Sequence, residues 1–195
     1  YANEVADACD AVGISAAEVI RAGKLGYART NLPMPGLVGG PCLEKDSHIL
    51  AEGLIELDME PKITMAARSL NSNQPSAIIQ FVRKLTQSLS GFPETPVITL
   101  MGIAFKGQPA TDDLRGTMAK PILNALRKAF PKAIYRGFDP VVKGTEIRDF
   151  GLQPVETLEQ AYENAHLVFI LNNHPLFFEM PIVSLANHMA SPSLI

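Results

Sequence analysis

The sequence contains few cysteines and no long hydrophobic run. Its 195 residues include only two cysteines, Cys9 and Cys42, which are too few for a disulfide framework or a cysteine-based zinc site. No apolar stretch approaches the roughly 20 residues that a membrane-spanning helix needs. Free thiols suit a reducing compartment, so we expect a cytoplasmic protein.

The sequence also lacks an excess of charge of one sign. Charged residues make up 19% of the chain, and the formal net charge is -3 at pH 7. A basic stretch is missing, which argues against an electrostatic role on nucleic acid or on a membrane surface. The dinucleotide-binding fingerprint G-x-G-x-x-G does not occur either. The length allows one large domain or two small ones, and the hydrophobic content of 47% is ordinary for a globular protein.

The clearest chemical signal is a glycine-rich segment that delivers a cysteine to the start of a predicted helix. Residues 36–46 read Gly-Leu-Val-Gly-Gly-Pro-Cys-Leu-Glu-Lys-Asp. Glycines let a backbone approach a ligand closely, and their amides can face phosphate or sugar oxygens. The helix dipole at Cys42 favours the thiolate that nucleophilic chemistry needs. Asp46 follows on the same helical face, where a carboxylate could orient or activate water. On spacing alone, an inert buried cysteine is the commoner alternative.

The first half of the chain predicts helices only, because nothing in it alternates with period two. Ser15 predicts the N-cap of the second helix, with Glu18 completing a capping box. Pro61 opens a later helix, and Pro75 predicts a kink or an end in it. A long loop that serves a site is expected at residues 27–41. Helices are expected at residues 1–12, 15–24, 45–58, 61–75 and 76–89.

From Val97 onward, short apolar strands alternate with helices. This order predicts a parallel, doubly wound sheet, so we expect an α/β fold with an all-helical domain at residues 1–92 and a Rossmann-like domain at residues 93–195. Thr117 is expected to cap the first helix of this half. Strands are expected at residues 97–102, 133–138, 152–155 and 167–171, helices at residues 118–130, 156–164 and 182–189, and the start of one further strand at residues 193–195.

Two motifs resemble those of a known enzyme family. Residues 39–46 resemble the G-G-x-C-L-x-K-D signature of the UDP-glucose/GDP-mannose dehydrogenase family, although Leu37 stands where a glycine is common. Residues 102–106 and 111–115 resemble the family's G-x-A-F-K and T-D-D-x-R elements, in the same order. The resemblance covers essentially the whole chain. It implies a central helical domain and a UDP-sugar-binding domain of an enzyme that oxidises a nucleotide-sugar alcohol to a uronic acid with two NAD, for polysaccharide precursors.

The resemblance implies catalytic and cofactor-binding roles for four residues. Cys42 would hold the sugar first as a thiohemiacetal and then as a thioester, which water cleaves with help from Asp46. Lys45 and Arg115 would face NAD. The covalent step explains why a cysteine is required, because it allows the aldehyde to be oxidised a second time by hydride transfer.

The resemblance also implies a substrate site and no metal. The paired acids Asp112 and Asp113 would by themselves suit magnesium, but the family needs none. Position alone leaves open that the polar loop side chains proposed for the substrate are merely solvated. The residues expected at the substrate are Arg29, Asn31, Gly36, Gly39, Phe105 and Lys106.

In the family, NAD is bound mainly by an N-terminal Rossmann domain that carries the G-x-G-x-x-G segment, and a lysine and an asparagine upstream complete the catalytic set. We therefore expect these 195 residues to be a fragment that is inactive by itself. The alternative is a natural, non-catalytic module that binds nucleotide sugars or dimerises. The sequence leaves the sugar nucleotide open among UDP-glucose, UDP-N-acetylhexosamines and GDP-mannose.

Apolar stripes in the first half predict self-association. Ile63, Ala67 and Leu70 form one stripe, and Ile78, Val82 and Leu85 form another. Together they exceed what one small helical bundle covers, and such stripes are usually interfaces. The resemblance implies a two-fold dimer through the helical domain, with the loop arginine of one subunit reaching the nucleotide of the other. We expect a homodimer through residues 1–90.

Overall fold

A computed structural model describes residues 1–26 and 31–195 of the chain, which divide into two units. Unit 1 comprises Tyr1–Val38 and Ser47–Gln74, and unit 2 comprises Gly39–Asp46 and Pro75–Ile195. The boundary expected from the sequence, between residues 92 and 93, lies in the linker that follows the last helix of the first half. The units of the structure instead divide within that helix. As a result the segment that carries Cys42 belongs to unit 2.

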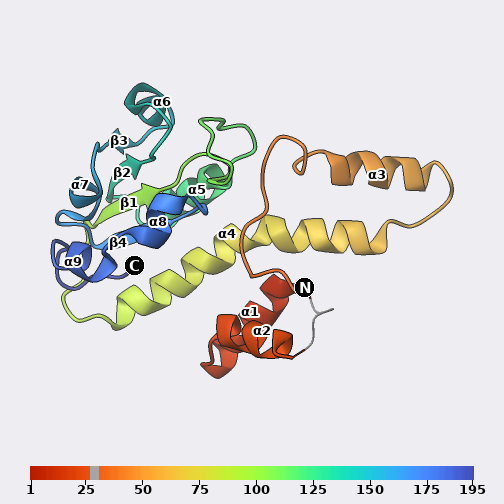
Figure 1. Cartoon of the computed structure of the whole chain (residues 1–195), viewed down its shortest axis with the longest axis horizontal. Helices are drawn as coiled ribbons and strands as arrows, with labels where there is room; N and C mark the ends of the chain where they lie inside the picture. Colours follow the sequence, from red (N-terminus) through yellow and green to blue (C-terminus); the bar gives the residue numbers. More distant parts are fainter. Residues whose placement is uncertain (27–30) are drawn as a thin grey trace. The chain divides into compact units, whose positions relative to one another are not determined.

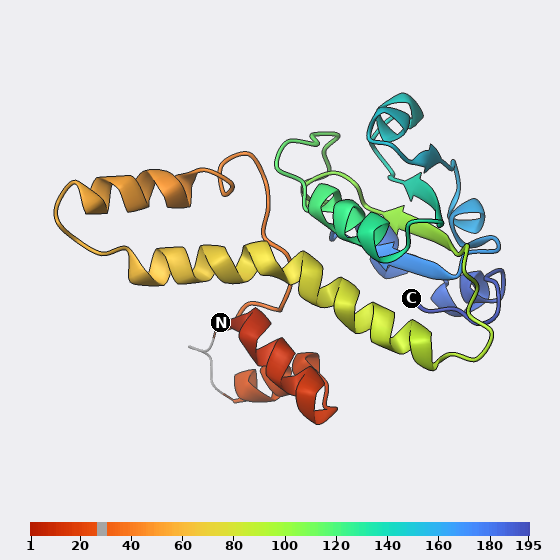
Figure 2. The same cartoon turned by 180° about the vertical axis from the view of Figure 1, so that it is seen from behind.

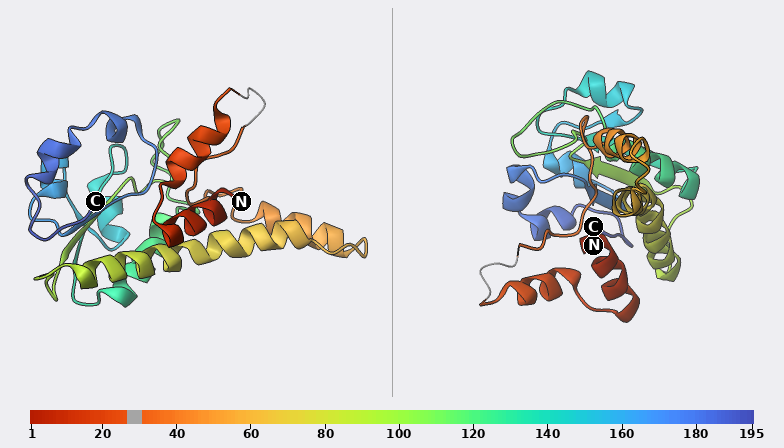
Figure 3. Two further views of the ribbon diagram at one scale, coloured as in Figure 1. Left: turned by 90° about the horizontal axis from the view of Figure 1, so that it is seen from below. Right: turned by 90° about the vertical axis from the view of Figure 1, so that its right-hand side faces the viewer.

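Unit 1 consists of helices, as predicted. The Ser15 hydroxyl accepts a hydrogen bond from the Glu18 amide at 3.3 Å, which confirms the predicted cap. The first helix of this unit lies beside its last helix, which contains Gln74 (Figure 3). The Gln74 side-chain amide donates to the Asp7 carboxylate at 3.2 Å. The helices are α1 (Ala2–Val12), α2 (Ala16–Lys24), α3 (Asp46–Ile55) and α4 (Lys62–Ser88), as Figure 1 shows. Unit 1 contains α3 from Ser47 onward and the first half of α4, up to Gln74.

The helix end that was predicted as one outcome at Pro75 was wrong, while a kink there stays a prediction. Helix α4 runs through Pro75 as one helix of 27 residues. A proline inside a helix removes one backbone hydrogen bond and crowds the preceding turn, at a cost of about 3 kcal/mol. Helix α4 nevertheless buries Asn71 and Gln74 before the proline and Ile79 after it. Packing of such residues supplies most of the stability of a helix in a protein, so it offsets the local defect.

Unit 2 is built on a parallel four-stranded sheet, as predicted. The strand order is β3-β2-β1-β4, and Ile98 on the central strand lies opposite Tyr135 on one side and Leu167 on the other. Leu194 forms a single parallel bridge with Leu167 at the edge, where a further strand was expected. The strands are β1 (Val97–Met101), β2 (Ile134–Phe138), β3 (Gln153–Pro154) and β4 (Leu167–Ile170).

Helices cover both faces of this sheet. In the opposite views of Figures 1 and 2, α8 (Pro175–Glu179) lies in front of the sheet in one and α5 (Ala119–Ala129) in the other. The predicted helices of the last third are present but shorter, as α7 (Leu158–Tyr162) and α9 (Ile182–Ala186). Helices α6 (Gly144–Asp149) and α8, of six and five residues, were not predicted.

The cap predicted for α5 was also wrong. The N-cap position belongs to Met118, whose side chain makes no capping hydrogen bond. The Thr117 hydroxyl instead donates to the Ile103 carbonyl at 2.6 Å and accepts from the Ala119 amide at 3.2 Å. Thr117 therefore ties the start of α5 to the end of β1.

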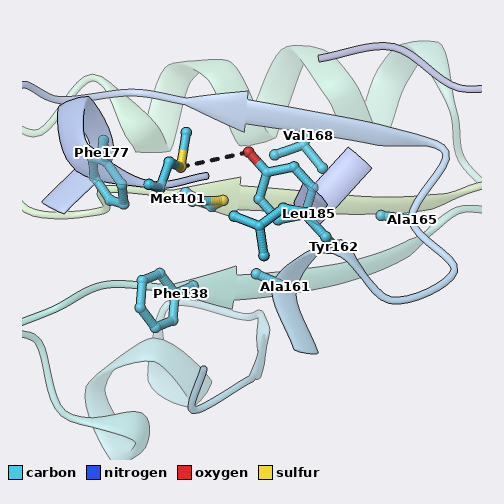
Figure 4. Packing of buried hydrophobic residues seen from close by; sticks show 9 residues of the cluster. Met101, Phe138, Ala161, Tyr162, Ala165, Val168, Phe177 and Leu185 are labelled. Atoms are coloured by element: carbon cyan, nitrogen blue, oxygen red, sulfur yellow. Dashed lines mark hydrogen bonds between the residues drawn. The ribbon is translucent and has the colours of Figure 1, made fainter. Parts of the chain in front are cut away.

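A core of apolar side chains fills the space between the sheet and helices α7, α8 and α9 (Figure 4). The Tyr162 hydroxyl lies 3.7 Å from the Met180 sulfur, and burial raises the pKa of this tyrosine. The phenyl rings of Phe138 and Phe177 meet edge to face at 6.5 Å. The buried members are Met101, Phe138, Ala161, Tyr162, Ala165, Val168, Phe177, Met180 and Leu185.

Nothing in the fold suggests a membrane-spanning segment within its described part. Across residues 1–26 and 31–195, no helix combines the length and the apolar character that crossing a bilayer requires.

We expect His166, which comes just before β4 and contacts the start of the central strand β1, to make the stability of unit 2 depend on pH. His166 Nδ1 accepts a hydrogen bond from the Val97 amide at 3.1 Å, and the Phe92 ring lies 6.0 Å away. Burial lowers the pKa of His166. Burial therefore favours the neutral form of this side chain in the folded state.

We predict that the free energy of unfolding falls as the pH drops from about 7 to about 5. The unfolded chain takes up a proton near the ordinary histidine pKa of about 6.5, whereas folded His166 resists it. The unfolded state then binds more protons, so stability rises with pH. Urea unfolding at several pH values measures this slope. His166→Asn keeps a hydrogen-bond acceptor but does not titrate, and should flatten the slope, whereas His48→Gln at an exposed position should not. An equal slope in both variants would contradict the prediction.

Candidate active site

Two backbone segments of unit 2 meet beyond the carboxyl end of β1: the turn at residues 39–46 and the loop at residues 102–118. The Gly40 amide donates to the Gly116 carbonyl at 2.8 Å. A Cβ atom on Gly39 would lie 2.5 Å from that same carbonyl oxygen, and one on Gly116 would lie 2.7 Å from the Gly40 backbone. Gly40 and Gly116 also have positive φ angles, of 106° and 62°. The glycines therefore permit this close approach of two backbones.

Cys42 lies on this turn and is exposed, whereas Cys9 is buried. The Cys42 carbonyl accepts hydrogen bonds from the Lys45 amide at 3.0 Å and the Asp46 amide at 2.9 Å, and the Glu44 amide donates to Gly40 at 3.1 Å. The turn is therefore coiled and leads into α3, which begins at Asp46. This places Asp46 one helical turn after Cys42.

A thiolate at Cys42 would raise the pKa of two cations, Lys45 and Arg115. Lys45 Nζ lies 2.9 Å from Asp46 Oδ1. The pKa of Lys45 is raised first by this hydrogen bond, and the charge of Cys42 adds a smaller effect. The pKa of Arg115 is raised first by its hydrogen bond to Asp113, and again Cys42 adds to it. An anion at this position, on the sulfur or on a ligand bound beside it, is attracted by both cations.

Arg115 is held in place by Asp113. Its Nε donates to Asp113 Oδ1 at 3.0 Å, its Nη2 donates to Oδ2 at 2.8 Å, and its backbone amide also donates to Oδ1, at 2.9 Å. These bonds, first among them those from the guanidinium, lower the pKa of Asp113 to about 2. The Arg115 side chain remains 78% exposed. Asp113 thus orients a cation rather than offering a free carboxylate.

Phe105 and Lys106 lie on the same side of unit 2 as Cys42. The Phe105 amide donates to the Asp113 carbonyl at 3.1 Å. Its ring packs on the turn, since a Cβ atom on Gly40 would lie 2.8 Å from the ring. Lys106 Nζ lies 5.2 Å from the centre of that ring, within the range of a cation–π contact. The structure therefore brings these two residues to the turn that carries Cys42.

Asp139 organises the loop after β1 and was not predicted. Its Oδ2 accepts from the amides of Ile103 at 2.7 Å and Ala104 at 3.0 Å. Its Oδ1 accepts from Val141 at 2.9 Å and Val142 at 3.0 Å. A carboxylate that accepts four amides is a strong tie between the ends of β1 and β2. Its place directly after a predicted strand was a signal that could have found it.

Two asparagines that follow β4 were not predicted either. Asn172 Nδ2 donates to the Ala104 carbonyl at 3.3 Å, and the Gly107 amide donates to Asn173 Oδ1 at 3.0 Å. A Cβ atom on Gly107 would collide with the backbone of His174. The loop that carries Phe105 and Lys106 is therefore tied to the carboxyl end of β4 as well.

The remaining residues expected at the substrate lie elsewhere. Arg29 lies outside the described residues. Asn31 is exposed and belongs to unit 1. Gly36 also belongs to unit 1, and both of its backbone polar groups are engaged by the Asn3 side chain, at 2.8 and 3.0 Å. Gly39 lies beside Cys42, where close packing alone already explains the glycine. The substrate contacts of these four residues stay predictions.

We predict that Arg115→Ala raises the pKa of the Asp113 carboxyl from about 2 towards the ordinary value of about 3.9. The reason is the loss of the guanidinium hydrogen bonds that favour the charged form. NMR titration of the carboxyl carbons measures the shift. Asp112→Asn, which alters an exposed neighbouring acid, should leave the Asp113 pKa unchanged. A pKa that stays near 2 in Arg115→Ala would show that the ion pair does not exist in solution.

Two family profiles match the chain, and they describe two domains of one family. Residues 1–73 match the central domain of the UDP-glucose/GDP-mannose dehydrogenase family. Residues 99–195 match the UDP binding domain of the same family.

Individual relatives agree with these matches. The chain is 30% identical over 183 residues to the UDP-N-acetyl-D-mannosamine dehydrogenase of Campylobacter jejuni, covering 92% of this chain and 42% of the relative. It is 26% identical over 202 residues to the UDP-glucose 6-dehydrogenase of Rhizobium meliloti (strain 1021), covering 100% and 44%. The solved UDP-D-ManNAc dehydrogenase of Pyrococcus horikoshii aligns with a TM-score of 0.72 and 28% identity, covering 96% and 41%. The chain therefore spans about two fifths of the length of these relatives.

Proposed function

This chain belongs to the UDP-glucose/GDP-mannose dehydrogenase family, and we propose that a protein containing it oxidises the primary alcohol of a UDP-sugar to a carboxylic acid. One observation carries the proposal. The exposed Cys42 is presented on a turn that is fixed against the loop after β1, with a carboxylate one helical turn away and two cations nearby. This arrangement suits covalent catalysis by a thiol, followed by hydrolysis.

Cys42 is the nucleophile of the second oxidation. Its sulfur adds to the carbonyl carbon of the aldehyde that the first oxidation forms, and the carbonyl oxygen takes up a proton to complete a thiohemiacetal. Loss of hydride from that carbon and of the hydroxyl proton leaves a thioester on the sulfur. Lys45 and Arg115 attract the negative charge that develops on oxygen while the carbon is tetrahedral.

Asp46 assists hydrolysis of the thioester. Its carboxylate takes a proton from the water that attacks the thioester carbon, after which the carbon–sulfur bond breaks and the thiol is restored. One carboxylate oxygen binds Lys45 at 2.9 Å. That bond orients the carboxylate, and the other oxygen is left to meet water.

The exposed cations beside Cys42 fit the cofactor of this family. Arg115 and Lys45 are charged, exposed at 78% and 63% of their side chains, and already oriented by carboxylates. Guanidinium and ammonium groups are common partners of dinucleotide phosphates. NAD, when bound, accepts the hydride released in each oxidation. Arg115 and Lys45 would help to hold and orient it beside the turn.

The substrate class is a UDP-sugar. The matched UDP binding domain contains Phe105 and Lys106, and these two residues pack beside the turn that carries Cys42. Lys106 suits a phosphate or a sugar oxygen as a point charge. The names of the relatives favour UDP-N-acetyl-D-mannosamine or UDP-glucose as the sugar nucleotide.

Unit 1 carries the surface proposed for dimerisation. A hollow of about 480 Å³ on this unit is lined by the stripe of Ile63, Ala67 and Leu70 together with residues of α1 and of the segment before Gly39. Ile63 is 87% exposed. Open apolar stripes of this kind usually meet another protein surface.

We predict that the 195-residue chain forms a dimer through the helices of residues 1–90. A second copy would cover the stripe around Ile63 in a self-complementary contact. Sedimentation velocity at micromolar concentration measures the mass. Ile63→Glu should weaken the dimer, whereas Ile170→Glu on the sheet of unit 2 should not. A monomer of 21.1 kDa would refute the prediction.

We further predict that, in a dehydrogenase that contains these residues, Cys42→Ala lowers acid formation at least about a thousandfold, because no thiohemiacetal can form. Asp46→Asn should slow hydrolysis by about two to three orders of magnitude and leave an acyl group on Cys42. Intact-mass spectrometry detects that group, and NADH formation measures the rate. Asp10→Asn, at an exposed position on α1, is the matched control. Normal acid formation by Cys42→Ala would eliminate the thiol mechanism.

A further inference from the structure

The carbonyl that holds the Cys42 turn belongs to Gly116, a residue that cannot fix the direction of its own backbone. The Gly40 amide donates to this carbonyl at 2.8 Å. Gly116 has a φ angle of 62° and no side chain, and glycine adopts positive and negative φ angles about equally readily. The direction of the Gly116 carbonyl must therefore be fixed by neighbouring residues.

Thr117 fixes the other end of the same peptide group. The Gly116 carbonyl, the Thr117 nitrogen and the Thr117 Cα atom lie in one plane, because a peptide bond is planar. The Thr117 hydroxyl donates to the Ile103 carbonyl at 2.6 Å and accepts from the Ala119 amide at 3.2 Å. Thr117 is buried, so water does not readily replace these partners. The plane that contains the Gly116 carbonyl is thus anchored by a buried side chain.

Ile103, which accepts from the Thr117 hydroxyl, is itself held at both of its backbone polar groups. Its amide donates to Asp139 Oδ2 at 2.7 Å, and its carbonyl accepts from Thr117. Asp139 also accepts from three further amides beyond the ends of β1 and β2. The Thr117 hydroxyl therefore bonds to a fixed point at the edge of the sheet.

A displacement of the Gly116 carbonyl would reach Cys42 through the turn. Gly40 lies two residues before Cys42, and its carbonyl accepts from the Glu44 amide at 3.1 Å. The Cys42 carbonyl accepts from the Asp46 amide at 2.9 Å. These bonds make the turn one coiled piece whose first amide is held by Gly116, and all of these groups belong to unit 2. Reaction rates are sensitive to misplacement of a catalytic group by about 1 Å.

We propose that Thr117 is a positioning residue: by holding the Gly116 carbonyl, it sets where the sulfur of Cys42 stands against the loop after β1. The Thr117 hydroxyl is buried and engaged by backbone groups, so it does not touch the reacting atoms. The proposal rests on the proposed role of Cys42 as the nucleophile.

Unit 2 supplies a matched control in Thr99. This threonine of β1 is also buried, and its hydroxyl likewise donates to a backbone carbonyl, that of Ala161 in α7, at 2.7 Å. Thr99→Val and Thr117→Val each remove one such bond and keep nearly the same side-chain shape. Only Thr117 adjoins Gly116, so the two variants separate positioning from a general loss of stability. Thr117→Ser keeps the hydroxyl and serves as the rescue.

The first test uses the 195-residue chain and needs no activity. Hydrogen exchange resolved by NMR follows the Gly40 amide, whose exchange should become about tenfold faster or more in Thr117→Val, because its acceptor is no longer held. Gly40 exchange should stay unchanged in Thr117→Ser and in Thr99→Val. If Thr117→Val folds poorly, Thr117→Ala removes the same hydroxyl without placing a methyl group against the Ile103 carbonyl. Equal Gly40 exchange in the hydroxyl-free Thr117 variant and in Thr99→Val would overturn the proposal.

The second test uses a dehydrogenase that contains these residues. Thr117→Val should lower kcat by about tenfold or more, whereas Thr117→Ser and Thr99→Val should stay within about threefold of the unsubstituted enzyme. The KM for the UDP-sugar should change by less than about threefold, because Asp139 and the two asparagines after β4 still hold the loop of Phe105 and Lys106. Rates are normalised to the folded fraction of each variant, which is measured by urea unfolding.

The outcomes separate this proposal from the proposed function. Faster Gly40 exchange in Thr117→Val with an unchanged kcat would show that the contact does not position Cys42, and would overturn the proposal. An equal kcat loss in Thr99→Val would also overturn it, because the effect would then be one of stability alone. Activity that survives Cys42→Ala would instead refute the proposed function, whatever the exchange result. Faster exchange together with a kcat loss that Thr117→Ser restores supports both.

Discussion

The site depends on a contact between two backbones, the hydrogen bond from the Gly40 amide to the Gly116 carbonyl at 2.8 Å. Side chains at Gly39, Gly40 or Gly116 would collide with backbone or with the Phe105 ring at less than 3 Å. Glycine is therefore required here by the packing of the protein on itself. Because this contact is made, Cys42 is held next to the loop that carries Arg115, and the charges of the loop act on the turn.

Around that contact, exposed ion pairs orient groups more than they stabilise the fold. The Lys45–Asp46 pair and the Arg115 guanidinium of the Asp113–Arg115 pair are largely open to water, where ion pairs contribute little to stability. Their geometry matters more, since each carboxylate holds a cation that still presents much of its surface. The loop after β1 is fixed by Asp139, whose carboxylate accepts hydrogen bonds from four backbone amides at 2.7 to 3.0 Å.

Most strands and helices could be predicted from the sequence, but two short helices and the course of α4 past Pro75 could not. The strands and α5 follow from runs of apolar residues with a clear period, and the α/β order follows from their alternation. Helices α6 and α8 have no such run. The uninterrupted path of α4 through Pro75 depends on what the helix packs against, and no local pattern contains that information.

The sequence by itself determined the local chemistry. Cys42 and Asp46 lie four residues apart in one coiled turn, so their proximity is a property of the chain, and the family motifs named Lys45, Phe105, Lys106 and Arg115. Only the tertiary structure decided what holds them together. The Gly40 amide meets the Gly116 carbonyl, and Asp139 meets Ala104 across 35 residues. Contacts at such separations form only when the folded backbone brings the partners together, and the residue types alone carry no sign of them.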